Sequence, residues 1–217
     1  MSKLKQKILL ATAMSSILVA STFAATGIGV WAGYGFHSNN INTSSESFTF
    51  KKNDAIWGMG ASYMLGYAGM KFGIGASYLQ PANTTISTAN YLWTYKTNTL
   101  LPIEAIAAYN INNNLNVQLD AGLAYIKQSL NYAVPNPPST PPPPSANFSG
   151  TTTGWKPVLG AAINYHLPMG VGFGVMIKHV FAGTPTAFTS NLPVDDDKGY
   201  RTIMSQTMAL ATLSYQF

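Results

Sequence analysis

The sequence predicts an all-β chain, an eight-stranded antiparallel up-and-down transmembrane β-barrel with short periplasmic turns and long extracellular loops. Charged residues make up only 9% of the 217 residues, whereas soluble domains contain about 25%. Beyond the N-terminus, the sequence has no apolar run approaching the ~20 residues of a transmembrane helix. Apolar residues instead recur at every second position in eight segments, which gives each strand one face for lipid and one for a lumen.

The N-terminus has the layout of a secretory signal peptide. Lys3, Lys5 and Lys7 are followed by a mostly apolar stretch over 8–20, and Thr22-Phe23-Ala24 provides small residues before a cleavage site. We expect residues 1–24 to be removed and 25–217 to form the barrel. The alternative, an uncleaved membrane anchor, is disfavoured because the apolar stretch is short and interrupted by serine.

Each of the eight alternating segments carries an apolar row on one face. In the first segment Ile28, Val30, Ala32, Tyr34 and Phe36 share this face, and the last segment ends the chain. The eight segments cover 28–36, 57–65, 70–78, 101–109, 117–125, 155–167, 171–181 and 209–217. Many rows carry Tyr, Trp or Phe near an end, and such aromatic residues form the girdles of a membrane barrel.

The connections between these segments alternate between short and long. Tight turns are expected at Gly66-Tyr67-Ala68-Gly69, at Asn112-Asn113-Asn114 and at Pro168-Met169-Gly170, and the long connections are 38–53, 80–96, 129–153 and 182–200. Short turns on one side and long loops on the other are typical of an outer-membrane barrel. A soluble sandwich or a lipocalin-like barrel also alternates, but a closed soluble barrel buries its apolar face inward.

The final strand carries a resemblance to a known family. Ala209, Ala211, Leu213, Tyr215 and Phe217 alternate and finish on a terminal aromatic residue. The chain thus resembles the small outer-membrane β-barrels, which include the OmpA transmembrane domain and opacity-like surface antigens. The resemblance implies that these five residues are the signal read by the barrel-assembly machinery.

If the apolar rows face lipid, a balanced set of charges faces the lumen: Asp54, Lys71, Glu104, Asp120, Lys156 and Lys178. Isolated charges in a barrel of low dielectric constant are costly, so opposite charges should pair. We interpret the set as a lumen charge network that plugs the barrel, with a narrow gated pore as the alternative. Trp31, Ile106, Ile126, Met176 and Leu210 also face inward, either as filler or as the lining of a slot for an apolar ligand.

Two loop segments stand out by composition. The proline-rich stretch, with Pro135, Pro137, Pro138 and 141–144, favours an extended polyproline conformation. It is interpreted as an exposed spacer, or alternatively as a ligand for an aromatic groove on another protein. The acidic triplet Asp195-Asp196-Asp197 lacks the spaced oxygen ligands of a calcium loop, and we expect a solvated turn, with divalent ions that bridge it to lipopolysaccharide phosphates as the alternative.

Catalysis is not expected. A nucleophile needs a positioned base and an orienting group, and the neighbours His37 and Ser38 should point to opposite faces of a strand. His166 and His179 have no obvious nucleophile beside them. A Ser–His–acid deacylase stays open as an alternative because Glu46 shares the loop next to His37.

We therefore expect a bacterial outer-membrane protein with a structural or surface-interaction role, typical of an adhesin or antigen. The alternatives are a narrow solute channel and, second, a lipid-A-modifying enzyme. The chain has no cysteine, and its formal charge of +5 includes the three lysines of the signal peptide. No cofactor and no nucleic acid are expected. The expected partners are outer-membrane lipid and lipopolysaccharide, the barrel-assembly machinery, and a host or surface protein that contacts the loops.

Overall fold

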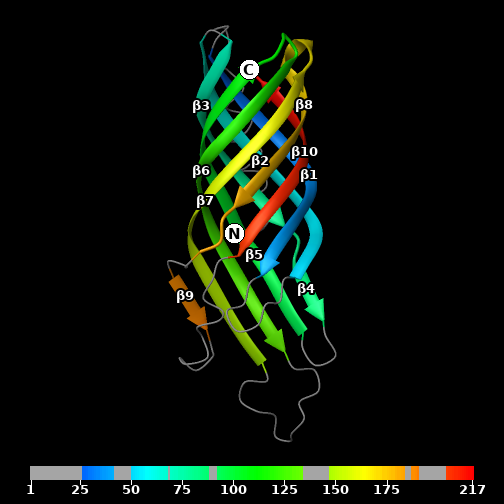
Figure 1. The fold of residues 1–217 in the computed structure, drawn as a ribbon, viewed down its shortest axis with the longest axis vertical. Coiled ribbons are helices and arrows are strands. Elements are labelled where there is room, and N and C mark those ends of the chain that lie inside the picture. Colours follow the sequence, from blue (N-terminus) through cyan, green and yellow to red (C-terminus); the bar gives the residue numbers. More distant parts are fainter. Residues whose placement is uncertain are drawn as a thin grey trace, which may run out of the picture.

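A computed structural model shows a closed β-barrel (Figure 1) and describes residues 26–41, 50–67, 69–87, 92–133, 147–183, 187–190 and 204–217. The expected signal peptide, the proline-rich stretch and the acidic triplet lie outside these ranges. The strands are β1 (Thr26–Ile41), β2 (Phe50–Tyr67), β3 (Met70–Pro81), β4 (Thr84–Ser87), β5 (Leu92–Asn110), β6 (Leu115–Ala133), β7 (Asn147–His166), β8 (Val171–Val180), β9 (Ala187–Ser190) and β10 (Ser205–Gln216).

Eight long strands of the described chain form the barrel. Around the ring their order is β3-β2-β1-β10-β8-β7-β6-β5, and β5 pairs with β3 to close it. Every pairing is antiparallel, including the pair formed by the first and last long strands, β1 and β10. The predicted eight-stranded up-and-down barrel is confirmed.

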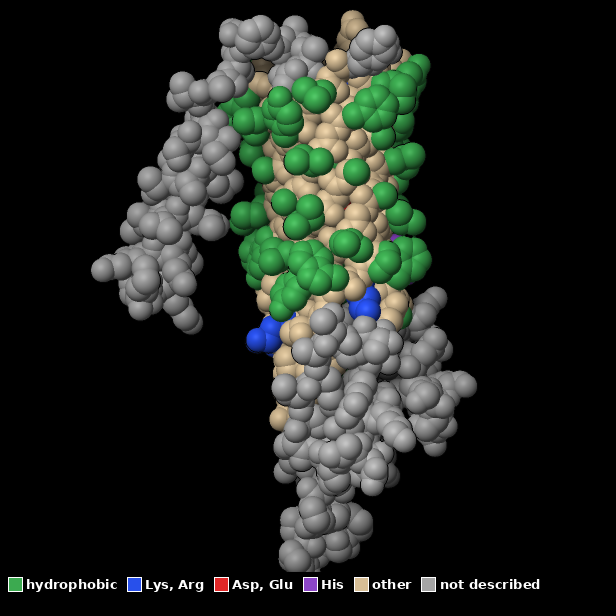
Figure 2. Space-filling model, turned by 90° about the vertical axis from the view of Figure 1, so that its left-hand side faces the viewer, with side chains coloured by type: hydrophobic (Ala, Val, Ile, Leu, Met, Phe, Trp, Pro, Cys, Tyr) green, Lys and Arg blue, Asp and Glu red, His purple; other side chains and the backbone are tan. Residues whose placement is uncertain are grey.

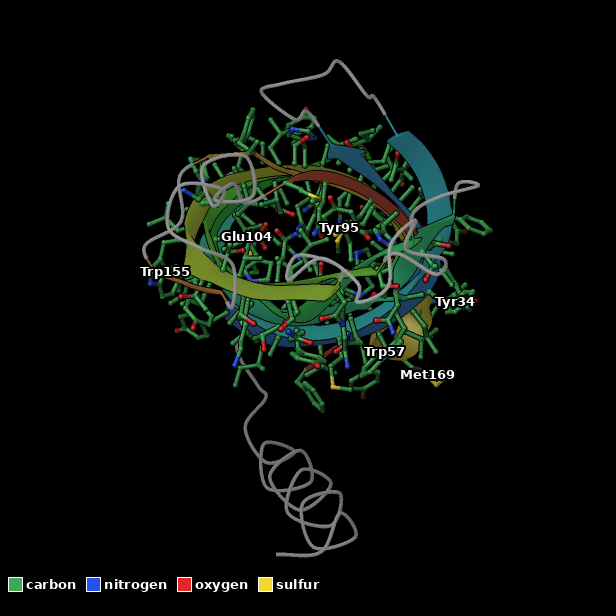
Figure 3. The ribbon with its side chains drawn as sticks, turned by 90° about the horizontal axis from the view of Figure 1, so that it is seen from below. Tyr34, Trp57, Tyr95, Glu104, Trp155 and Met169 are labelled. Atoms are coloured by element: carbon green, nitrogen blue, oxygen red, sulfur yellow. The ribbon has the colours of Figure 1, made fainter. Side chains whose placement is uncertain are left out.

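The apolar rows face outward, as a membrane barrel requires. Outward side chains such as Ile74, Leu119 and Val175 are more than half exposed, whereas their inward neighbours are small or buried. Figure 2 shows hydrophobic side chains over the face of the wall that is in view, with positively charged side chains at its lower border. In Figure 3 Tyr34, Trp57 and Trp155 point away from the ring, while Glu104 and Tyr95 point into it. No helix in the described ranges has the length and apolar character of a membrane span.

The short connections lie where the sequence predicts them. Gly69, in the first, has a positive φ of 81° that glycine adopts without strain. In the second, the backbone amides of Asn114 and Leu115 donate to Asn112 Oδ1 at 2.9 and 2.8 Å. The third is a short 3-10 turn, Pro168–Gly170. These three turns define one end of the barrel, called the turn end.

The strands continue further into the long connections than the sequence predicts. β5 and β6 pair from Leu92↔Ala133 onward, and β7 begins at Asn147 although the loop was expected to last to residue 153. The extensions are rich in Thr, Ser and Asn. They therefore lack apolar alternation, but backbone pairing does not require it.

Beyond the barrel rim these extensions continue the barrel sheet at the opposite end, called the loop end. β4 pairs with β5 at Thr84↔Tyr95, and β9 pairs with β7 at Thr153↔Ala187. With β6 in the centre, the order is β4-β5-β6-β7-β9. Figure 1 shows these strands reaching below the rest of the barrel. We call this five-stranded unit the protruding sheet.

Candidate functional site in the lumen

Apolar side chains close the half of the lumen nearest the loop end. Leu100 on β5 and Ile126 on β6 are cross-strand partners, and Val158 and Val180 are partners on β7 and β8. All four are fully buried. The cluster, called the apolar plug, consists of Ile56, Leu79, Leu100, Ala124, Ile126, Val158, Val180, Met208 and Leu210, with Trp31 packed against it.

A polar layer lies next to the plug, on the side of the loop end. Gln206 on β10 donates from Nε2 to Thr97 Oγ1 on β5 at 2.8 Å, across the lumen. Gln128 Oε1 accepts a hydrogen bond of 3.2 Å from the backbone amide of Met204. Gln206 and Thr97 are buried, so this layer adds a second closure.

A buried ion triad lies next to the plug, on the side of the turn end. The ammonium of Lys178 on β8 donates to Glu104 Oε1 on β5 at 2.6 Å and to Asp120 Oδ2 on β6 at 3.1 Å. Asp120 Oδ1 also accepts from Gln118 Nε2 at 2.6 Å. All three charged residues are at most 5% exposed. One ammonium thus serves two carboxylates in a site shielded from water.

The triad has room because small residues surround it. Gly122 is the cross-strand partner of Glu104, and Gly160 pairs with both Asp120 and Lys178. A Cβ on Gly160 would lie 3.0 Å from Asp120 Oδ2 and 3.1 Å from Lys178 Cγ. A larger residue there would displace the charged groups, so these glycines set the position of the ion pairs.

A small polar cavity lies between the triad and the turn end. Its volume is about 100 Å³, and its lining includes the triad, Lys71 and His166. Lys71 on β3 donates to Gln216 Oε1 on β10 at 3.2 Å. Asn116 joins this layer, with its Nδ2 2.7 Å from His166 Nε2 and its Oδ1 accepting from Asn164 Nδ2 at 3.1 Å. Lys71, His166 and Gln216 also line an open recess among the turns, so the cavity faces the turn end.

The structure divides the six charged residues expected in the lumen among four places. Glu104, Asp120 and Lys178 form the triad, and Lys71 lies in the layer at the turn end. Asp54 is half-buried at the loop end of β2, where its backbone carbonyl lies 3.2 Å from His37 Nδ1. Lys156 lies beside Gly183: a Cβ atom added to this glycine would lie 3.0 Å from Lys156 Nζ.

The three histidines do not form a common site. His37 is buried near the loop end beside Asp54, whereas His166 contacts Asn116 near the turn end. His179 lies on the outward face, with Nδ1 2.8 Å from Thr207 Oγ1 and its ring against Phe181. Glu46 lies outside the described residues. In the described ranges, no cluster of three His, Cys, Asp or Glu has an arrangement that could hold a metal ion.

Sequence reasoning missed the extent of the apolar plug and the role of Gln206. Ile126, Leu210 and Trp31 were expected to face inward, but Leu79, Leu100 and Val158 were not singled out. Each is an apolar residue inserted between outward residues, and this departure from strict alternation could have identified it. Gln206 could not have been found, because its partner Thr97 lies 109 positions away.

The plug predicts a closed lumen. Wild-type protein in a planar bilayer is expected to give no steady current, because the fully buried side chains leave no continuous water path. Replacing Leu100 and Ile126 by glycine removes two facing plug residues, and we expect stepwise conductance to appear. The control is the double variant Leu119→Gly/Leu123→Gly, which removes a similar volume from the lipid-facing side of β6. Steady current through the wild type would contradict the closed lumen.

Comparisons with known proteins agree with this architecture. The family model for the outer membrane protein beta-barrel domain matches residues 9–217. No curated protein matches the chain. A major outer membrane protein from Thermus thermophilus aligns with 89% of this chain and 100% of its own, at 12% identity and a TM-score of 0.51.

Two further solved structures are similar in outline only. The attachment invasion locus protein Ail of Yersinia pestis, in complex with the heparin analogue sucrose octasulfate, covers 88% of this chain and 99% of its own, at 10% identity and a TM-score of 0.49. The outer membrane protease OmpT of Escherichia coli aligns with 92% of this chain and 99% of its own, at 8% identity and a TM-score of 0.37. At such identities and TM-scores, neither structure transfers a fold assignment or an activity to this chain.

Proposed function

Because this chain belongs to the outer membrane protein beta-barrel domain family and lies in the outer membrane, we propose that it is a closed anchor that presents a surface for interaction with other molecules. The observation that carries the proposal is the protruding sheet. Three barrel strands, β5, β6 and β7, continue past the rim on one side of the barrel and are flanked there by β4 and β9, and the lumen inside the barrel is filled. Long loops of outer-membrane barrels face outside, so the protruding sheet is the part of the described chain that a host or surface protein would meet.

The proposed role is not enzymatic. Acid–base or nucleophilic chemistry needs its groups within hydrogen-bond reach of one another. His37 and His166 lie near opposite ends of the barrel, and His179 faces outward beside Thr207. The ion triad is buried on the turn-end side of the plug, where both of its carboxylates accept hydrogen bonds from Lys178. These placements favour a structural role for the lumen over a protease or a lipid-A-modifying site.

We also propose the route by which the barrel reaches the membrane. Residues 1–24 would be removed on export, so the mature protein would begin at Ala25. Ala209, Ala211, Leu213 and Tyr215 would present the assembly signal, because all four are exposed on the outward face of the last strand. Phe217 would complete it. Its ring packs edge-on against Tyr215 with centroids 4.6 Å apart, and its amide donates to Ile28 O at 2.9 Å.

The surface role is tested by trimming the protruding sheet without disturbing the barrel. Gln128 and Thr152 are cross-strand partners, so an Asn-Gly turn that replaces residues 129–151 should close the hairpin in register. In a strain without other adhesins, we expect cells with the wild-type barrel to adhere to cultured cells or matrix proteins, and cells with the trimmed barrel to lose most of this adhesion.

A matched control separates the sheet from the proline-rich stretch. Replacing 134–146 by a Gly/Ser segment of equal length keeps the paired parts of β6 and β7. Heat-modifiable electrophoretic mobility and surface labelling verify that each variant is folded and exported. Equal adhesion of the trimmed and wild-type barrels would refute the proposal.

A further inference from the structure

An irregularity in β5 turns a lysine toward the outside of the barrel. The pairing of β5 with β6 is regular up to Thr99↔Lys127 and then shifts, so that Thr97 faces Gln128 and Asn98 is the extra residue of a β-bulge. Thr97 is buried in the lumen and Lys96 is exposed. Without the bulge, the alternation from outward Leu101 would place Lys96 inside. The bulge therefore re-aims this side chain, as bulges commonly do.

The outward-turned Lys96 lies next to a second lysine. Lys96 pairs with Ser129, and Lys127, two residues along β6, pairs with Thr99. Lys127 is also exposed on the outward face. The two lysines thus occupy diagonal positions on neighbouring strands. The Cα atoms of such a pair are about 7–8 Å apart, so the two long side chains can reach the same ligand.

Polar groups between the two lysines are joined by hydrogen bonds. Asn98 Nδ2 donates to Ser129 Oγ at 2.5 Å, and Ser129 Oγ lies 3.3 Å from Thr151 Oγ1 on β7. Thr153 pairs with Lys127 on the same outward face. We define the rim patch as Lys96, Asn98, Lys127, Ser129, Thr151 and Thr153. It contains two positive charges and no carboxylate.

The level of the rim patch relative to the membrane follows from two aromatic residues on its turn-end side. Tyr125 and Trp155 pack together with ring centroids 5.5 Å apart, and such rings mark the headgroup zone. Lys127 and Thr153 are the next outward residues toward the loop end, about 7 Å further along their strands. Figure 2 shows positive side chains at this border of the apolar band.

We propose that the rim patch binds a phosphate group of the outer-leaflet glycolipid, of the lipid A type, beside the barrel wall. The lysines supply charge, and the amide and hydroxyl groups supply hydrogen bonds to phosphate oxygens. The glycolipid is favoured over a soluble anion because the patch begins where the apolar band ends, so acyl chains can cover the band while the phosphate meets the lysines. This inference rests on the proposed outward position of the loop end and identifies the residues that contact lipopolysaccharide.

The test measures binding of bisphosphorylated and dephosphorylated lipid A to full-length mature protein folded in detergent micelles. We expect wild type to prefer the bisphosphorylated lipid, and the Lys96→Gln/Lys127→Gln variant to bind it about fivefold more weakly. The Lys96→Arg/Lys127→Arg variant should keep the preference. The charge-matched control is Lys51→Gln/Lys52→Gln on β2, a strand separated from β5 by β3.

Two results would overturn the inference. One is equal preference for phosphate in the wild type and the double glutamine variant. The other is lysine-dependent binding of a soluble sulfated polysaccharide without any preference between the two lipids, which would assign the rim patch to a partner's glycan. The Lys96→Gln/Lys127→Gln variant keeps the whole protruding sheet, so its adhesion tests the surface role independently of lipid binding.

Discussion

Replacing Lys178 by methionine is expected to destabilise the folded barrel by about 3–5 kcal/mol. Methionine has a similar length and fits an apolar environment, so the loss comes mainly from the charge. Without the ammonium, Glu104 and Asp120 would face each other as two buried carboxylates that have lost the cation between them. Both are at most 5% exposed, so only water in the small cavity beside them could take the place of the lost partner.

The free energy of unfolding in urea, measured in lipid vesicles with tryptophan fluorescence, checks this expectation. The triple variant Lys178→Met, Glu104→Gln, Asp120→Asn removes all three charges and should recover a large part of the loss. Lys71→Met is the matched control, because Lys71 is half-buried and donates to the neutral Gln216. We expect this control to lower the free energy of unfolding by about 1 kcal/mol. A cost of Lys178→Met no larger than that of the control would show that the triad does not hold the lumen together.

Replacing Ala211 by arginine is expected to destabilise the barrel by about 2–4 kcal/mol and to lower the amount of assembled protein in cells. Ala211 is exposed in the middle of the outward row of β10, between Tyr34 on β1 and Val175 on β8. A guanidinium at this level would have to remain among acyl chains or bend toward a distant interface. Both outcomes carry a free-energy cost.

The matched control for this variant is Thr207→Arg, on the same outward row but closer to the loop end beside His179. Near the interface an arginine should cost about 0–1 kcal/mol. Unfolding in urea gives the stability, and heat-modifiable mobility gives the folded fraction in membranes. If the Ala211→Arg variant assembled and unfolded like the Thr207→Arg variant, the assigned membrane level of this row would be wrong.

The triad and the lipid-facing row illustrate how far reasoning from the sequence reaches. Strand alternation has a strict period of two, so the outward face of Ala211 and the inward faces of Glu104 and Lys178 follow from the sequence alone. Their contacts do not. Lys178 and Glu104 are 74 positions apart, and β8 and β5 are not neighbours in the ring. The two residues meet because the closed barrel brings their strands face to face across the lumen.

The apolar alternation by itself determined the strand number, the order of short and long connections, and the face on which each residue lies, because a pleated strand in lipid must keep one face apolar. Only the tertiary structure decided where the lumen closes, which of the six inward charges meet, and where the bulge at Asn98 turns Lys96 outward. It also decided how far β5, β6 and β7 extend beyond the rim. These features depend on the stagger between strands and on backbone pairing of polar segments, and neither leaves an apolar pattern in the sequence.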